Sequence, residues 1–217
     1  MKFNFLLIVL SLFVVSSGCQ VKGTNKISNQ SSPPMNTEGL KKAYFASGCF
    51  WCVEAVYESV KGVQESISGY SGGHTKNPTY NSSNTGTTGH AEAVEIYYDP
   101  SIVDFATLVD VYFGSQNITQ VNGQGPDKGS QYRSIIFYQN EEEKAIIDKK
   151  VAALNAELAP EKVAAEVMPF EKFWVGEDYH QNYERLHPNQ GYIQGVSVPR
   201  LKKFQKKFPN LIKEASH

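Results

Sequence analysis

The fold starts from one stretch, KKAYFASGCFWCVEAVYESV at residues 41–60, in which an apolar run is followed directly by a helical pattern. The run Lys41–Ser47 predicts a β-strand. Phe50–Val60 predicts a helix, because its apolar side chains recur with the i, i+3, i+4, i+7 spacing of one helical face: Val53, Val56, Tyr57 and Val60. We expect Ser47 to cap this helix and Gly62 to end it. The sequence GCFWC therefore lies at a strand-to-helix junction.

The rest of the chain continues this alternation. Strands are predicted at 63–70, 91–100, 131–138 and 162–167, and helices at 105–113 and 141–158, with polar loops at 71–89 and 120–129. The first six elements run β-α-β-β-α-β, the order of the ferredoxin-like split βαβ sandwich, an α+β fold with helices packed on a mixed sheet. An irregular C-terminal extension follows, and an amphipathic helix is predicted near its end from Leu201, Phe204 and Phe208.

The N-terminus has the layout of an export signal. Residues 1–18 carry one positive charge at Lys2, then an almost unbroken apolar run that ends in small residues. The run is shorter than the roughly 20 residues of a membrane-spanning helix. Cys19 resembles the lipidation site of a bacterial lipoprotein, although Ser16 stands where such signals usually have an apolar residue. We expect an exported protein, held to the cell envelope by lipid on Cys19 and facing the periplasm or the cell surface, with residues 19–40 as a flexible tether.

The composition indicates a soluble globular domain. The 217 residues are 41% hydrophobic and 20% charged, and the formal net charge is −1. Without a dense stripe of Lys and Arg, the sequence lacks the electrostatic footprint of a nucleic-acid-binding protein. We expect a monomer with one folded domain, residues 41–217, behind the signal and the tether.

Cys49 and Cys52 are the free thiols that remain if Cys19 is lipidated. A structural disulfide is disfavoured, since closing so short a loop adds little stability. Zinc is disfavoured because His74 and His90 would have to complete the site from a polar loop. Two redox interpretations remain: a thioredoxin-like C-x-x-C exchanger, and an enzyme that uses Cys49 as a nucleophile and recycles it through a disulfide. The helix start is expected to lower the thiol pKa of Cys49 below the usual value of about 8.5.

The order of the later motifs distinguishes these interpretations. GCFW is followed by GYSGG, NPTY, TGHAEAVEIYYDP and DKGSQYRSIIFY, and this succession resembles the methionine sulfoxide reductase A family over roughly residues 41–208. The resemblance implies thiol-dependent reduction of methionine S-sulfoxide, free or in oxidised envelope proteins, to methionine. It implies no metal and no organic cofactor, and electrons from an external, thioredoxin-like thiol reductant. A thioredoxin-like dithiol oxidoreductase and a non-catalytic surface lipoprotein are the alternatives.

The resemblance also implies roles for particular residues. Cys49 is the nucleophile that attacks the sulfoxide sulfur and becomes a sulfenic acid. Phe50 and Trp51 are the apolar surface that receives the substrate's methyl group. The residues implied around the sulfoxide oxygen are Tyr80 and Tyr132 as hydroxyl donors and Asp127 as the acid that orients substrate and water.

Glu92 is the implied proton donor. Alternation along the strand at 91–100 places its side chain on the same face as Val94 and Ile96. Burial there, without a cationic partner, raises the pKa of a carboxyl toward the value that an acid needs near neutral pH. Glu95 suits a solvent-facing position better, and His90 is expected to be structural.

The sequence departs from the family pattern at the step that recycles Cys49. Many members carry a recycling cysteine in a Gly-Tyr-Cys context near the C-terminus, and here Ile193 occupies that place. Cys52 becomes the candidate resolving thiol. Residues three apart on a helix have Cβ atoms about 5–6 Å apart, whereas a disulfide needs about 3.5–4.5 Å, so Cys49 would have to precede or distort the first turn. In the alternative, Cys52 only packs in the core and an external thiol reduces the sulfenic acid.

Overall fold

The structure is a computed structural model that describes residues 36–214. The predicted signal at 1–18, the predicted lipidation site Cys19 and most of the predicted tether lie outside the described residues. From Thr37 onward the described chain forms one compact unit. No helix in this range is long and apolar enough to cross a membrane.

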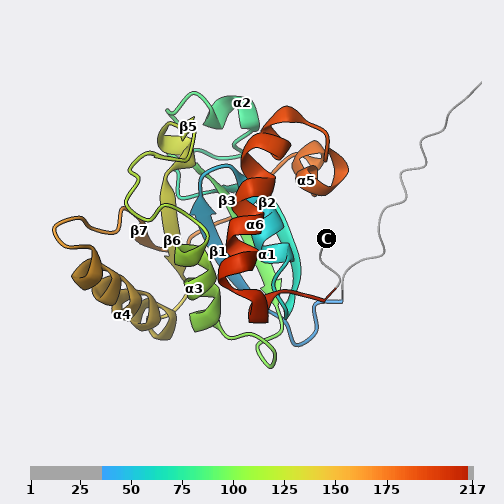
Figure 1. Cartoon of the computed structure of the whole chain (residues 1–217). Coiled ribbons are helices and arrows are strands. Elements are labelled where there is room, and N and C mark those ends of the chain that lie inside the picture. The colour runs from blue at the N-terminus through green and yellow to red at the C-terminus, as the bar shows by residue number, and fades with distance from the viewer. Residues whose placement is uncertain (1–35, 215–217) are drawn as a thin grey trace, which may run out of the picture. The chain divides into compact units, whose positions relative to one another are not determined.

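A six-stranded mixed sheet forms the centre of the fold, in the order β7-β6-β1-β3-β2-β8 (Figure 1). Its strands are β1 (Lys41–Ser47), β2 (Val63–Ser71), β3 (Ala91–Tyr98), β6 (Ser134–Tyr138), β7 (Glu166–Pro169) and β8 (Trp174–Val175). The inner four, β6-β1-β3-β2, pair antiparallel in the order of the ferredoxin-like split βαβ fold. β7 adds a parallel strand at one edge and β8 an antiparallel strand at the other. The predicted α+β class is confirmed.

Helices cover one face of this sheet. They are α1 (Phe50–Glu58), α3 (Phe105–Gly114) and α6 (Val198–Lys207), which lie in front of the strands in Figure 1. The core between them is aromatic, and the rings of Phe45 and Tyr57 stack with their centroids 5.1 Å apart. On the opposite face, Phe170 stacks on Tyr44 at 3.6 Å. Both faces of the sheet are therefore covered.

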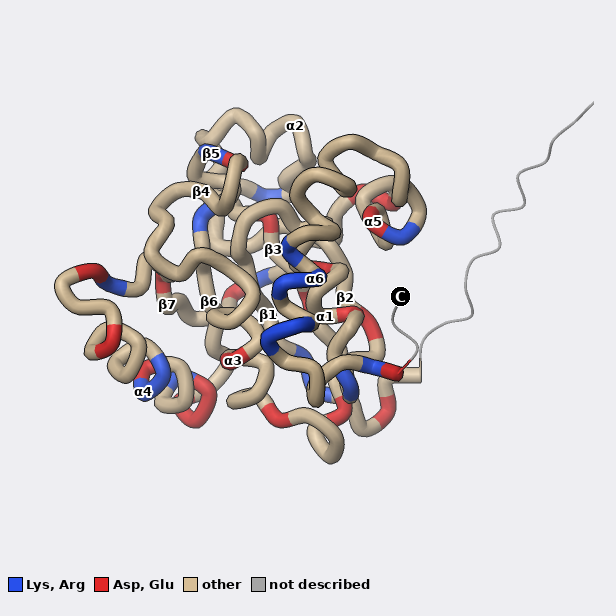
Figure 2. The backbone as a smooth tube through the Cα atoms, in the orientation of Figure 1, with Lys and Arg blue, Asp and Glu red and all other residues tan. Residues whose placement is uncertain are grey.

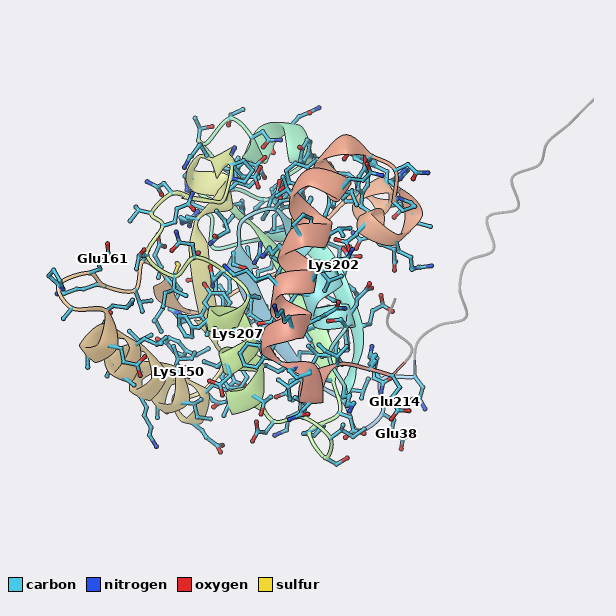
Figure 3. The ribbon with its side chains drawn as sticks, viewed as in Figure 1. Glu38, Lys150, Glu161, Lys202, Lys207 and Glu214 are labelled. Atoms are coloured by element: carbon cyan, nitrogen blue, oxygen red, sulfur yellow. The ribbon has the colours of Figure 1, made fainter. Side chains whose placement is uncertain are left out.

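A fourth long helix, α4 (Glu141–Leu158), packs against α3. It has the bounds that the sequence predicts, because Asn140 caps it and three glutamates occupy its positive end. Lys150, labelled in Figure 3, pairs across the contact with Asp110 of α3 at 2.7 Å.

The helix predicted near the C-terminus is confirmed as α6. Phe204 is buried in the core, and Leu201 and Phe208 pack against it. Figure 2 shows basic residues gathered along this helix, and Figure 3 labels Lys202 and Lys207 on it. The helix therefore turns its apolar side to α1 and its lysines outward.

Several local predictions need correction. Ser47 does not cap α1: it ends β1, and its carbonyl and hydroxyl both accept hydrogen bonds from Arg200, each at 2.9 Å. Cys49 is the N-cap residue, and α1 ends at Glu58 instead of Val60. The strand predicted from residue 131 begins at Ser134, after a 3-10 turn, η1 (Ser130–Tyr132).

The polar loops contain short elements that the sequence did not predict. Within 71–89 lies the helix α2 (Tyr80–Ser83), which begins with a capping box between Thr79 and Ser82. Within 120–129 a hairpin forms from β4 (Gly123–Gln124) and β5 (Asp127–Lys128). The strand predicted at 162–167 is displaced to β7, because the Ala164 N–H donates to the Ile118 carbonyl instead of joining the sheet.

The C-terminal extension returns to the start of α1. Its elements are η2 (Asp178–His180), α5 (Tyr183–Leu186) and a π-helical turn, η3 (Ile193–Ser197), that leads into α6. Gln181 holds the extension to β2 by exchanging two hydrogen bonds of 2.9 Å with the Ser68 backbone. The Asn182 N–H donates to the buried carboxyl of Glu54 on α1. These bonds bring the extension against the GCFWC junction.

Candidate active site

A pocket of about 210 Å³ opens at the N-terminal end of α1. Its lining residues come from the starts of α1 and α2, from strands and turns, and from the C-terminal extension: Cys49, Phe50, Trp51, Tyr80, Glu92, Asp127, Tyr132, Gln190 and Tyr192. The structure thus brings together every residue that the family resemblance implies for nucleophile, acid, hydroxyl donor and methyl surface. Gln190 and Tyr192 are additions that the sequence did not predict.

The turn at Gly48 creates the junction. Gly48 has a φ of +83°, and a Cβ added there would lie 2.5 Å from the Gln124 Cβ, so only glycine fits. Cys49 follows in a non-helical conformation, with φ −54° and ψ 123°, and its carbonyl accepts from the N–H groups of Cys52 and Val53. Cys49 therefore precedes the first helical turn, which is the condition set above for a Cys49–Cys52 disulfide.

Glu92 supplies a buried acid beside this turn. It lies on β3, is 2% exposed, and its Oε2 accepts the Phe50 N–H at 3.0 Å. Burial raises the pKa of Glu92 to about 8; the Phe50 N–H opposes the rise, while the nearby Asp127 and Cys52 add to it. The carboxyl consequently keeps its proton at neutral pH and has one to give.

The two thiols change each other's pKa. Both cysteines are free and buried, and they lie within hydrogen-bonding reach of each other. Burial, followed by the contact with Cys52, raises the thiol pKa of Cys49 well above its ordinary value. The hydrogen bond from Cys49 lowers the pKa of Cys52 to about 6, against its own burial, and the charge of Arg200 contributes. The expectation of an acidic Cys49 thiol is wrong for the free protein, since burial outweighs the helix end.

Tyr192 connects the thiols to the acidic side of the pocket. Its hydroxyl donates to Asp127 Oδ2 at 2.6 Å and lies 3.7 Å from the Cys52 sulfur. Burial raises the pKa of Asp127, and the hydrogen bond from Tyr192 opposes this rise. Cys52 is therefore not itself a lining residue of the pocket, but it contacts Tyr192, which is one.

Two tyrosines, Tyr80 and Tyr132, line the pocket together with Cys49. Tyr80 begins α2 and Tyr132 ends η1, and both are partly buried. Burial raises the pKa of each phenol, with the charge of Glu92 contributing, so both remain protonated donors. The Tyr80 ring lies 6.4 Å from that of Phe50. The aromatic surface and the hydroxyl donors thus face one space.

Two further expectations have structural outcomes. Glu95 is not solvent-facing: it is 7% exposed, because β3 is a central strand, and it accepts from the Tyr44 hydroxyl at 2.8 Å. His90 is structural, as expected, since one ring nitrogen accepts the Gly73 N–H and the other bonds the Thr75 carbonyl. Among the described residues, no cluster of three or more metal-binding side chains occurs.

The residues that the sequence missed come from the C-terminal extension. They are Glu177, His180, Gln190, Tyr192 and Arg200. Arg200 donates to Ser47 at the end of β1 and to the Ser115 carbonyl after α3. The sequence feature that could have indicated some of them is the segment GEDYHQNY at residues 176–183, where polar and aromatic residues are concentrated without helical or strand periodicity.

We predict that Glu92→Gln gains stability over the wild type as the pH rises. The unfolded carboxyl ionises at its ordinary pKa, whereas the folded one keeps its proton up to a pKa of about 8. Between these values the native state binds more protons than the unfolded state, so the free energy of unfolding of the wild type falls with pH. Glutamine keeps an acceptor for the Phe50 N–H and does not ionise.

Denaturant unfolding from about pH 4 to about pH 9 measures this difference. The gap should widen up to about pH 8, by about 1.4 kcal/mol for each unit by which the pKa is raised, and then level off. Glu142→Gln, on the exposed side of α4, is the control. A gap that does not change with pH would contradict the buried, protonated carboxyl.

Comparison with known proteins agrees with this geometry. Residues 41–212 match the family model described as peptide methionine sulfoxide reductase. A relative from Pasteurella multocida, named peptide methionine sulfoxide reductase MsrA, is 44% identical over 173 residues, 80% of this chain and 99% of its own. A relative of the same name from Saccharolobus solfataricus is 44% identical over 174 residues, 80% of this chain and 98% of its own.

Solved structures extend the likeness to three dimensions. Methionine sulfoxide reductase A of Corynebacterium diphtheriae is 31% identical, with a TM-score of 0.64 over 73% of this chain and 78% of its own. Mxr1 from Saccharomyces cerevisiae in reduced form is 27% identical, with a TM-score of 0.67 over 74% of this chain and 92% of its own. A thioredoxin-like exchanger would not share this family match, so that alternative is set aside. The chain belongs to the peptide methionine sulfoxide reductase family.

Proposed function

We propose that this protein reduces the S epimer of methionine sulfoxide, free or within proteins, to methionine. The observation that carries the proposal is the convergence of a thiol and a protonated acid on one pocket, with Cys49 and Glu92 both buried and both lining it. Sulfoxide reduction needs these two groups, because a soft nucleophile attacks sulfur while an acid protonates the departing oxygen.

The first step transfers the sulfoxide oxygen to Cys49. The Cys49 sulfur attacks the substrate sulfur, its proton passes to the Cys52 thiolate, and Glu92 protonates the oxygen. The products are methionine, a Cys49 sulfenic acid, a neutral Cys52 thiol and an ionised Glu92, so the total charge is unchanged. The contact between the two buried thiols supports this route, because it raises the pKa of Cys49 and lowers the pKa of Cys52.

The remaining pocket residues bind and orient the substrate. Phe50 and Trp51 receive the methyl group, and their rings, 6.2 Å apart, offer a rigid apolar surface. The hydroxyls of Tyr80 and Tyr132 donate hydrogen bonds to the sulfoxide oxygen. Asp127, held by Tyr192, orients the substrate and the departing water.

The second step regenerates the thiol through Cys52. Its sulfur attacks the Cys49 sulfenic acid, an S–S bond forms, and water leaves. The non-helical conformation of Cys49 supports this assignment. An external thiol reductant of the thioredoxin type then returns both cysteines to thiols. The chain needs no metal or organic cofactor for either step.

The place of action follows from the N-terminal sequence. We propose export by the signal at residues 1–18, lipidation of Cys19 and attachment to the cell envelope, where the enzyme repairs oxidised envelope proteins. The family match begins at residue 41, which leaves the preceding residues free to serve as signal and tether.

Cys49→Ser tests the reaction itself. Serine fills the same space without a soft nucleophile, so the variant should yield no methionine in a single turnover with an S-sulfoxide peptide, whereas the wild type should yield one methionine per enzyme. The R epimer is the matched substrate control and should remain unreduced by both. An unchanged rate for the variant would overturn the assignment.

Cys52→Ala tests the recycling step. Single turnover should still release one methionine per enzyme, although more slowly, because Cys52 no longer accepts the Cys49 proton. Steady turnover with a thioredoxin-type reductant should fall to a small fraction of the wild-type rate, because no internal disulfide forms. Val53→Ala, which removes apolar volume at the neighbouring buried position, controls for packing. Full steady turnover in Cys52→Ala would show that an external thiol reduces the sulfenic acid directly.

Cys19→Ser tests the attachment. In a bacterial host the wild-type chain should incorporate labelled palmitate and sediment with membranes, and the variant should do neither. Ser17→Ala, two residues earlier in the signal, serves as the control. Unlabelled wild-type protein found in the soluble fraction would refute the anchor and leave the enzymatic proposal intact.

A further inference from the structure

We infer that Glu177 and His180, on the C-terminal extension, are positioning residues that set the size of the methyl pocket. His180 contacts Trp51 of the aromatic surface, and Glu177 contacts Tyr80, which carries one of the two hydroxyl donors. Because the two residues lie close together in the chain, they hold the two sides of the pocket at a fixed separation, so the site accepts a methyl sulfoxide and rejects a larger alkyl sulfoxide. The inference rests on the proposed function, because it concerns the substrate that the same pocket takes.

His180 holds the aromatic surface. It is 1% exposed, and its Nδ1 accepts the indole N–H of Trp51 at 3.1 Å. Its ring also packs against Phe50 and Tyr80, with centroid distances of 4.7 Å to each. Tyr183 stacks on the Trp51 indole, with the ring centroids 3.7 Å apart. The indole is therefore held by the stacked Tyr183 ring and by the hydrogen bond to His180. A stacked ring can slide over its partner, so the hydrogen bond is the contact that fixes the orientation of the indole within its own plane.

The protonation state of His180 suits this contact. Nδ1 accepts a hydrogen bond only when the imidazole is neutral and its proton is on Nε2. Burial lowers the pKa of His180, and the charge of Glu177 opposes that effect. Nε2 has no hydrogen-bond partner among the described residues, and its nearest acid is Glu177, whose Oε2 is 3.8 Å away. The buried ring is thus held mainly through the Trp51 bond and its aromatic neighbours.

Glu177 holds the side of the pocket that carries the Tyr80 hydroxyl. Its Oε1 accepts the backbone N–H of Tyr80 at 2.9 Å, and its Oε2 accepts the Tyr70 hydroxyl at 2.8 Å. Tyr70 lies opposite Glu92 in the β2–β3 register. One carboxylate therefore ties the first residue of α2, which carries a sulfoxide-binding hydroxyl, to the strand beside the catalytic acid.

The two residues act as one brace because they are neighbours on a short anchored segment. η2 contains His180, and Glu177 directly precedes it. Gln181, the next residue, is bonded to Ser68 of β2. Trp51 and Tyr80 are thus connected through His180 and Glu177 to a single rigid support. Without it, the Trp51 indole would lose its hydrogen bond and keep its ring contacts, and the Tyr80 N–H would lose its bond to the extension.

Size selection follows from that rigidity. A pocket that rejects one extra methylene gains about 10–200-fold in specificity, provided that its sides do not move apart. The brace prevents this movement by holding Trp51 and Tyr80 to one segment. Loosening it should therefore reduce the preference for a methyl over an ethyl sulfoxide more than it reduces activity on the methyl substrate.

The test compares kcat/KM for blocked methionine S-sulfoxide and blocked ethionine S-sulfoxide. His180→Phe keeps the ring packing and removes the acceptor, so the methyl-to-ethyl ratio should fall at least fivefold. His180→Asn places an amide oxygen where Nδ1 lies and should recover most of the ratio. Asp178→Asn, on the exposed side of η2, should stay within twofold of the wild type.

A second pair of variants keeps the test decisive if His180→Phe does not fold. Glu177→Gln retains an oxygen for the Tyr80 N–H and should keep the ratio near that of the wild type, whereas Glu177→Ala should lower it. In a Trp174→Phe background, Trp51 fluorescence should shift in His180→Phe and remain unchanged in His180→Asn.

The outcomes separate the two proposals. A wild type that reduces neither sulfoxide refutes the proposed function. A wild type that prefers the methyl substrate, together with unchanged ratios in His180→Phe and Glu177→Ala, refutes the brace and leaves the function standing.

Discussion

A buried hydrogen bond from the Phe50 N–H to the Glu92 carboxyl, 3.0 Å long, is the interaction on which the site depends. The first N–H groups of a helix have no partner within the helix, and here a carboxyl on the neighbouring strand supplies one. The same bond sets Glu92 beside Cys49, because Cys49 is the residue directly before Phe50. Glu92 therefore has two roles. It accepts the Phe50 N–H at the start of α1, and it is the acid that sulfoxide reduction requires.

The place of Cys52 follows from the same junction. Ile193 is fully buried where many family members carry a recycling cysteine, and the segment around it forms the π-helical turn η3. The C-terminal extension nevertheless reaches the thiols, since Tyr192 contacts Cys52 and Arg200 contributes to its low pKa. The two thiols that supply the electrons for sulfoxide reduction therefore lie only three residues apart, at Cys49 and Cys52. Neither of them comes from the C-terminal extension.

The sequence predicted what depends on local patterns and motifs. β1 and α4 have their expected bounds, because the residues that determine them lie within or next to each segment: an apolar run for β1, and the Asn140 cap and the first-turn glutamates for α4. The motif residues meet in one pocket because the split βαβ order brings β1 and β3 together. The acidity of Cys49 was mispredicted, since burial by the rest of the fold is not visible in a strand-helix junction. His180 was missed because its partner, Trp51, lies 129 positions away.

In the proposed reaction, reduction of the substrate is coupled to oxidation of Cys49 and Cys52 together. The most direct measurement is the intact mass and the peptide map of reduced enzyme after one equivalent of a methionine S-sulfoxide peptide, without added reductant. We expect one methionine to form, the protein to become lighter by the mass of two hydrogen atoms, and the map to contain a peptide in which Cys49 is bonded to Cys52. Methionine formed together with a protein heavier by one oxygen atom, or with no Cys49–Cys52 bond, would contradict the proposed reaction.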